Sequence, residues 1–182
     1  MHRPLIEIDY GGLRKVISGG QCGADQGGLV AAIDLGLETG GWAPKGWRTA
    51  QGPRPDLEKL GLREHSSSDS HLRTLSNVLS SDATIAFASR PNSTGTLLTK
   101  KLCVRHNKPF HLVKLPVPSL DLEQTIRQAT DFIVNSACST LNVAGNRDLS
   151  SEADYHKWYT HSLLSEIFKD LRDSNLLVGR TP

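Results

Sequence analysis

The sequence predicts a single α/β domain in which helices cover both faces of an open parallel sheet. Short apolar runs alternate with amphipathic stretches along nearly the whole chain, and this order is typical of a repeated strand–helix unit. Several apolar runs stop at glycine-rich turns, as strands do where the chain must bend sharply. The chain has 182 residues, of which 37% are hydrophobic and 22% charged. This length and composition suit one globular core.

Five strands are expected, each as a short apolar run that ends at glycine, proline or a polar turn. The first, KVIS, stops at Gly19. The second lies in a Gly- and Pro-rich segment that also holds a long loop. The strands are placed at residues 15–18, within 38–61, and at 83–89, 109–115 and 140–145.

Helices are expected between these strands. The first contains the small residues Ala24, Gly28, Ala31 and Ala32, which would allow close packing on a sheet, and it is closed by Gly36. The others carry apolar residues at helical spacing. These apolar residues are Leu72, Leu75 and Leu79; Leu98 and Leu102; Leu122, Ile126, Ala129 and Ile133; and Leu164, Ile167, Phe168 and Leu171. The helices are placed at 24–36, 71–82, 97–107, 119–137 and 150–173, the last with Ser151 and Asp154 as a capping box.

Residues 1–14 are predicted to be an N-terminal extension, residues 15–174 the ligand-binding domain, and residues 175–182 a C-terminal tail. The net charge of +2 is too small to indicate a nucleic-acid partner. No apolar run resembles a secretory signal or approaches a membrane span. The three cysteines are far apart and fit neither a disulfide framework nor a zinc site. We therefore expect a cytoplasmic protein without membrane or nucleic-acid partners.

Four loops are expected to meet at one edge of the sheet. They follow the predicted strands at residues 18–25, 40–48, 91–96 and 144–148. Ligands of open parallel sheets bind beyond the carboxyl ends of the strands. Two of the loops run into helix starts, where free N–H groups and the helix dipole favour an anion. A phosphate or similar oxyanion is thus predicted there, although a single glycine-rich loop is often only a turn.

A nicotinamide dinucleotide site is disfavoured. Its Gly-x-Gly-x-x-Gly motif would begin at Ser18, so the first glycine is missing. The end of the second strand, read as GGWAPKG, also lacks the acidic residue for the ribose and offers Lys45 instead.

The segments SGGQCGADQG and GGWAPKG, followed by SSDATIAF, STGTLLTKKLCVRHNKP and LNVAGNR, resemble the blocks of the molybdenum carrier family. The resemblance covers roughly residues 15–172, with Cys22 where threonine is expected. It implies a Rossmann-like fold related to the LOG and lysine-decarboxylase-like proteins. It also implies a homo-oligomer that binds molybdenum cofactor, which is a phosphate-bearing pterin, sometimes together with molybdate. Such a protein protects the cofactor from oxidation and delivers it to molybdoenzymes.

The related LOG enzymes cleave nucleoside monophosphates with a motif similar to Pro-Gly-Gly-x-Gly-Thr-x-x-Glu. Here the matching segment keeps Gly95 and Thr96 but has Thr99 in place of the glutamate. Threonine is no acid or base near neutral pH. The sequence therefore favours a carrier without catalysis. A LOG-type phosphoribohydrolase, with Asp25 as a nearby carboxylate, and a non-catalytic nucleotide sensor remain the alternatives.

The predicted binding residues lie in the four loops, and no catalytic or metal-ligating residue is assigned. Backbone amides of the first loop, the Lys45 ammonium and the polar groups of the third loop are expected to contact the anion. Ordinary roles in turns, helix caps, packing or solvated surface are the alternative for each. The predicted residues are Gly19, Gly20, Gln21, Cys22, Gly23, Asp25, Lys45, Ser93, Thr94, Gly95, Thr96 and Asn146, with Arg147 at the rim and Trp42 or Trp47 as a stacking surface.

Overall fold

The computed structural model describes residues 9–149 and 154–178. Its centre is a six-stranded sheet in the order β5-β2-β1-β8-β6-β7, in which every pair of neighbours is parallel. This confirms the predicted α/β class. The sheet strands are β1 (Lys15–Ser18), β2 (Glu38–Ala43), β5 (Leu62–Glu64), β6 (Ala83–Ala88), β7 (Phe110–Lys114) and β8 (Thr140–Gly145).

Within the described residues, five α-helices and three short 3-10 helices lie between or after the strands. The α-helices are α1 (Ala24–Asp34), α2 (Ser70–Leu79), α3 (Thr94–Arg105), α4 (Leu122–Asn135) and α5 (Tyr155–Val178). The 3-10 helices are η1 (Lys45–Trp47), η2 (Pro55–Leu60) and η3 (Ser119–Asp121). A small antiparallel hairpin, β3 (Arg48–Thr49) with β4 (Gly52–Pro53), projects from the segment between η1 and η2.

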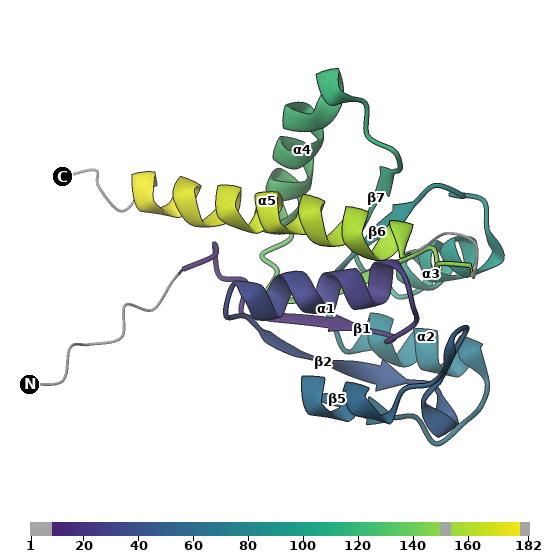
Figure 1. The fold of residues 1–182 in the computed structure, drawn as a ribbon. Coiled ribbons are helices and arrows are strands. Elements are labelled where there is room, and N and C mark those ends of the chain that lie inside the picture. The colour runs from purple at the N-terminus through teal and green to yellow at the C-terminus, as the bar shows by residue number, and fades with distance from the viewer. Residues whose placement is uncertain (1–8, 150–153, 179–182) are drawn as a thin grey trace, which may run out of the picture.

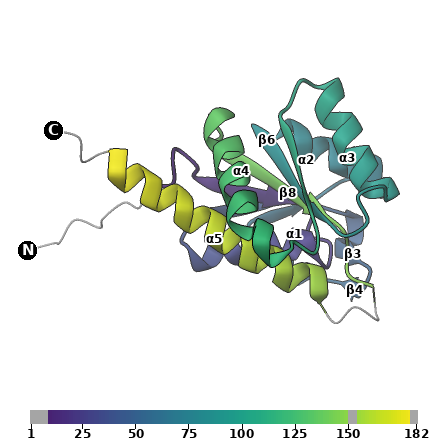
Figure 2. The ribbon, with the colours of Figure 1, turned by 90° about the horizontal axis from the view of Figure 1, so that it is seen from above.

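The helices form a layer on each face of the sheet (Figures 1 and 2). Helices α1, α4 and α5 pack on one face, and α2 and α3 pack together on the other. Helix α1 lies between the sheet and α5, and it is buried on nearly all sides. This position requires its small residues: a Cβ at Gly28 would lie 2.6 Å from Val143 of β8, and one at Gly27 would lie 2.3 Å from the Lys157 carbonyl of α5.

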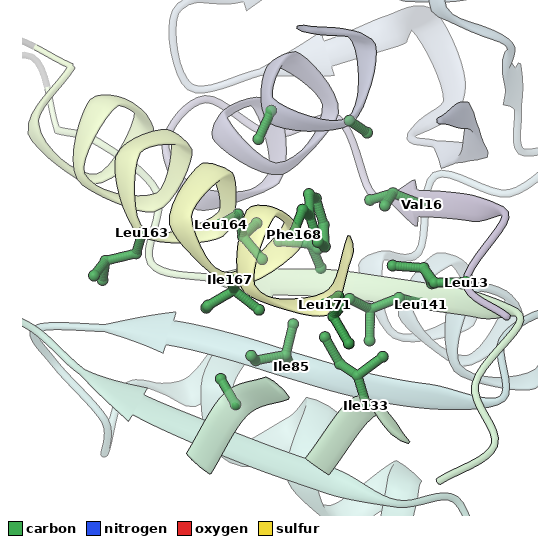
Figure 3. Packing of buried hydrophobic residues seen from close by; sticks show 14 of the residues in the cluster. Leu13, Val16, Ile85, Ile133, Leu141, Leu163, Leu164, Ile167, Phe168 and Leu171 are labelled. Carbon is green, nitrogen blue, oxygen red and sulfur yellow. The ribbon is translucent and has the colours of Figure 1, made fainter. Parts of the chain in front are cut away.

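The main core lies between the sheet and the layer of α1, α4 and α5. Figure 3 shows the apolar side chains of α5 gathered with Ile85 and Leu141 of the sheet and Ile133 of α4. The predicted face of this helix is confirmed, since Leu164, Ile167, Phe168 and Leu171 are all buried. Burying apolar surface of this kind is the dominant favourable term in folding.

The predicted apolar face of the second helix is wrong. Leu72 and Leu79 of α2 are exposed, at 43% and 49%, and the buried contacts come from Val78 with the partly buried Leu75. The helix turns a polar side toward the sheet edge, and this side forms part of the site described below.

The boundaries also differ from those predicted. Tyr10 and Leu13, in the expected extension, are buried in the main core. The segment 38–61 was expected to end in a loop, but the chain that follows it adds the edge strand β5. Helix α5 continues through Val178 into the expected tail. Ser151 lies outside the described residues, and the α5 amides of His156 and Lys157 donate instead to Asp148, at 2.7 and 3.2 Å.

Within residues 9–149 and 154–178, no helix combines the length and the apolar character needed to cross a membrane.

Candidate functional site

The strand order changes direction between β1 and β8. Strands β2 and β5 lie on one side of β1. Strand β8 lies on the other side of β1, between it and the pair β6-β7. Adjacent strands whose connections run to opposite sides leave a crevice at their carboxyl ends, where ligands of open α/β sheets bind. A cavity of about 570 Å³ lies at this point and has the size of a small-molecule site.

Loops after β1, β6 and β8 line the cavity together with α2 and the first turns of α3. Three arginines and one carboxylate are among the lining residues, so the cavity carries positive charge. The lining residues are Gly19, Gln21, Asp25, Ser70, Arg73, Thr74, Asn77, Arg90, Ser93, Thr94, Gly95, Leu98, Thr99, Asn142, Val143, Ala144, Gly145, Asn146, Arg147 and Leu149.

The first turn of α3 forms one wall of the cavity. Ser93 is the N-cap, and its hydroxyl accepts a hydrogen bond from the Thr96 amide at 3.4 Å. A helix leaves its first amides without intrahelical acceptors, and in α3 these include the N–H groups of Thr94 and Gly95. Both residues line the cavity. This wall therefore offers amide donors and the positive end of a helix dipole to an anion.

Asn146 joins the loop after β8 to this wall. Its side-chain oxygen accepts from the Arg90 amide at 2.7 Å, and its amide group donates to Ser93 Oγ at 3.1 Å and Thr96 Oγ1 at 3.3 Å. The residue is buried. These bonds use most of its hydrogen-bonding capacity, so Asn146 positions the α3 turn, and its remaining lining surface is small.

Helix α2 forms the opposite wall, and sequence reasoning missed it. Ser70, Arg73, Thr74 and Asn77 all line the cavity. Their spacing of 0, 3, 4 and 7 places them on one side of a helix. That polar stripe was the available signal, but polar residues on a helix usually face solvent, and the topology was needed to show what they face.

The side chains of Arg73 and Asp25 meet beside the first loop. Arg73 Nη1 lies 3.8 Å from Asp25 Oδ2, at the outer limit of an ion pair, and the side chains are only 13% and 9% exposed. The Gln21 amide also donates to Asp25 Oδ2, at 3.2 Å. Arg73 Nε is buried and has no hydrogen-bond partner among the described residues. A buried donor of this kind is costly to leave unpaired, so it marks a place where a ligand acceptor would be stabilised.

Gly19 makes room for this arrangement. A Cβ at this position would lie 1.6 Å from Arg73 Nη1 and 2.7 Å from Asp25 Oδ2. Any larger residue would therefore displace the guanidinium from the first loop.

Burial raises the pKa of the Asp25 carboxyl, and the Arg73 guanidinium and the amides of Gln21 and Gly19 oppose this shift. Because the pKa is higher in the folded chain than in the unfolded chain, the folded protein holds this proton more tightly. Asp25 therefore becomes more favourable to the folded state as the pH falls from its folded-state pKa toward its unfolded-state pKa.

We expect the free energy of unfolding of the Asp25→Asn variant, minus that of the wild type, to be more positive at pH 7.5 than at pH 4.5. The amide removes the cost of a buried charge that the wild type bears only when the carboxyl is ionised. Urea unfolding of both proteins at the two pH values measures the difference. A stability difference that is constant with pH, or larger at pH 4.5, would contradict the raised pKa.

Among the remaining predicted residues of the first loop, Gly20, Cys22 and Gly23 lie outside the cavity lining. A Cβ at Gly20 would point into Leu57 and Leu62, and one at Gly23 would meet the backbone of residues 146–148. Cys22 is buried, and burial raises the pKa of its thiol. Gln21 lines the cavity, but its side chain is held by the Arg48 carbonyl at 2.9 Å and the Ala50 amide at 3.3 Å.

The second loop does not line the cavity. Lys45 begins η1, and the neighbouring Gly46 amide donates to the Glu64 carboxylate. The backbone of Trp42 is paired with the Asn77 side chain, and its ring packs edge-on against His65 at 5.9 Å. Thus three of the four predicted loops meet at the cavity, whereas Lys45, Trp42 and Trp47 lie outside its lining. Thr96 also lies outside it, behind Ser93.

Residues 16–168 match the model of a family described as the circularly permutated YpsA SLOG family. The chain is also similar to a crystal structure from Syntrophus aciditrophicus SB, of a protein named "Putative molybdenum carrier protein". The two share 33% identity with a TM-score of 0.76, over 86% of this chain and 95% of that one. None of the curated proteins matches this chain.

Proposed function

Because this chain belongs to the circularly permutated YpsA SLOG family, we propose that it binds a phosphate-bearing pterin of the molybdenum cofactor type and carries it without chemical change. Two features of one cavity carry the proposal: the first amides of α3 lie in one wall, and Arg73, whose buried Nε has no partner among the described residues, lies in the other. The molybdenum-carrier name of the similar crystal structure supports the choice of cargo.

The two walls of the cavity suit the two ends of such a ligand. The amides of Thr94 and Gly95, with Arg90 and Arg147 in the same lining, suit a phosphate. Arg73 suits a second anionic group, such as the dithiolene or an attached molybdate. The Asp25 carboxylate, next to Arg73, suits the N–H and amino donors of a pterin ring.

The direct test is retention of the cargo. Purified protein is incubated anaerobically with released molybdenum cofactor and passed through a gel-filtration column. Pterin fluorescence after oxidation and molybdenum by mass spectrometry are then measured in the protein fraction. We expect both to co-elute with the protein in a fixed ratio. Their absence in several preparations would remove the proposal, whereas pterin without molybdenum would restrict the cargo to the metal-free form.

Nucleotide binding is the second candidate, because the α3 turn that suits a pterin phosphate would also suit a nucleoside monophosphate. At the position of the LOG glutamate, Thr99 Oγ1 donates to the Gly95 carbonyl within α3 at 3.0 Å. A hydroxyl held in this way supplies neither an acid nor a base.

We therefore expect no release of free base when the protein is incubated with AMP or GMP, even if either nucleotide binds. Chromatography of the mixture, with a matched sample without protein, measures the base. Steady release above that background would show that another group, with Asp25 as the first candidate, replaces the missing glutamate.

We propose further that the carrier delivers its cargo to a molybdoenzyme and acts as a homo-oligomer in the cytoplasm. Light scattering of the purified protein measures the mass of the assembly, and transfer to an apo-molybdoenzyme measures delivery.

A further inference from the structure

A second cluster of functional groups lies outside the cavity lining. Ser89 follows the last residue of β6, Asp148 follows β8, and His156 lies in the first turn of α5. Ser89 Oγ is 2.7 Å from His156 Nε2, and His156 Nδ1 is 2.8 Å from Asp148 Oδ1. Ile85 and Phe87 belong to the core beneath α5, so the pleat of β6 turns Ser89 toward the same layer. Arg90, the next residue, lines the cavity instead.

The hydrogen bonds suit a general base. A carboxylate oxygen accepts, so the His156 ring donates its Nδ1–H to Asp148, and when the ring is neutral its Nε2 accepts the Ser89 hydroxyl proton. Asp148 also accepts the amides of His156 and Lys157 at 2.7 and 3.2 Å. Asp148 and His156 are fully buried, whereas Ser89 is exposed. The base is therefore held rigidly, and the residue that carries the hydroxyl is exposed.

From this geometry we propose that Ser89, His156 and Asp148 form a nucleophilic triad for acyl transfer from small activated esters. A serine is activated in this way when its base is held by a third group. The chain order Ser, Asp, His, with the serine at the end of a parallel strand, is that of the α/β-hydrolases. The proposal does not depend on the cargo of the cavity.

The acyl transfer from an ester has two stages. Ser89 Oγ bonds to the carbonyl carbon while its proton passes to His156 Nε2. The bond from that carbon to the leaving oxygen breaks, and the leaving oxygen takes the proton from His156. Water then cleaves the acyl-serine by the reverse route, with His156 accepting the water proton and returning it to Ser89.

One component found in α/β-hydrolases is engaged elsewhere. In those enzymes the amide after the serine stabilises the oxyanion, but here the Arg90 amide donates to Asn146 at 2.7 Å. Loss of one such donor costs about 10²- to 10³-fold in rate. We therefore expect the triad to react with activated esters and organophosphonates and to be slow with ordinary esters.

The test uses the full chain and a fluorophosphonate probe. The Ser89 oxygen should displace fluoride from phosphorus, and peptide mass spectrometry should locate the adduct on Ser89. We expect the folded protein to react on this residue at least about 100-fold faster than the same chain unfolded in urea, as an activated serine does. Equal rates in the two states, or an adduct only on other residues, would overturn the proposal without any variant.

Three variants assign the roles. Ser89→Ala should remove the adduct, and Ser80→Ala, at an exposed serine outside the cluster, should keep it. His156→Gln should lower the rate on Ser89 at least about 100-fold while circular dichroism shows an intact fold. An unchanged rate in a folded His156→Gln protein would show that the cluster only braces α5 against β6. If this variant does not fold, the comparison of folded and unfolded wild type decides.

Discussion

Replacing Arg73 by methionine is expected to lower the affinity of the cavity for its anionic ligand by roughly 10- to 150-fold. A hydrogen bond to a charged group contributes about 1.5–3 kcal/mol, and that free energy corresponds to such a factor. We expect a hydrogen bond of this strength at Arg73 because its side chain is only 13% exposed and its Nε has no partner among the described residues. A ligand acceptor would thus satisfy a donor that residues 9–149 and 154–178 leave unpaired.

Two further variants separate this effect from a general loss of positive charge. Arg63→Met removes an exposed guanidinium from β5, outside the cavity lining, and should leave the affinity unchanged. Gly19→Ala keeps Arg73 but puts a methyl group where its guanidinium lies, so it should weaken binding in the same direction. Fluorescence titration with released molybdenum cofactor measures all three. Equal losses in Arg63→Met and Arg73→Met would contradict a specific role for Arg73.

The sequence located most of the loops that line the cavity because a topological rule connects strand ends to ligand sites. Glycine-rich turns at the ends of short apolar runs are visible without a structure, and Gly19, Ser93 and Asn146 were found in this way. Their common position depends only on strands being parallel. The rule says nothing about which side chains extend into the crevice. Gln21, for example, lines the cavity, but its side chain is bonded to the neighbouring loop.

Helix α2 and the Lys45 loop show what a sequence pattern leaves open. Arg73 lies on a polar helix side that would look the same if it faced solvent. Lys45 lies between proline and glycine in a loop that was expected to contact the anion. This loop instead folds into η1, and its Gly46 amide donates to the Glu64 side chain of β5. In both cases the outcome depends on contacts between segments distant in the sequence, which periodicity does not record. The triad likewise joins Ser89 to residues 59 and 67 positions later.

Substitution of Gly23 by alanine is expected to destabilise the fold by roughly 2–6 kcal/mol. The residue has φ of 97°, a conformation that costs an L-residue about 1–3 kcal/mol. An added Cβ would also lie 2.5 Å from the Asn146 carbonyl oxygen and 2.6 Å from the Asp148 amide nitrogen. Both are backbone atoms, which cannot rotate away, and overpacking of this kind costs about 1–3 kcal/mol more.

Gly36→Ala is the matched control, since Gly36 has φ of 75° and a Cβ there would meet nothing within 4 Å. It should cost only the conformational strain, about 1–2 kcal/mol. Urea unfolding of the two variants therefore isolates the close approach between residue 23 and the loop after β8. That approach lets the Ala24 amide donate to the Asn146 carbonyl at 3.0 Å and brings Asn146 to the start of α3. Equal losses in both variants would mean that the loop can shift away from α1, and then Asn146 could not hold the α3 wall in a fixed position.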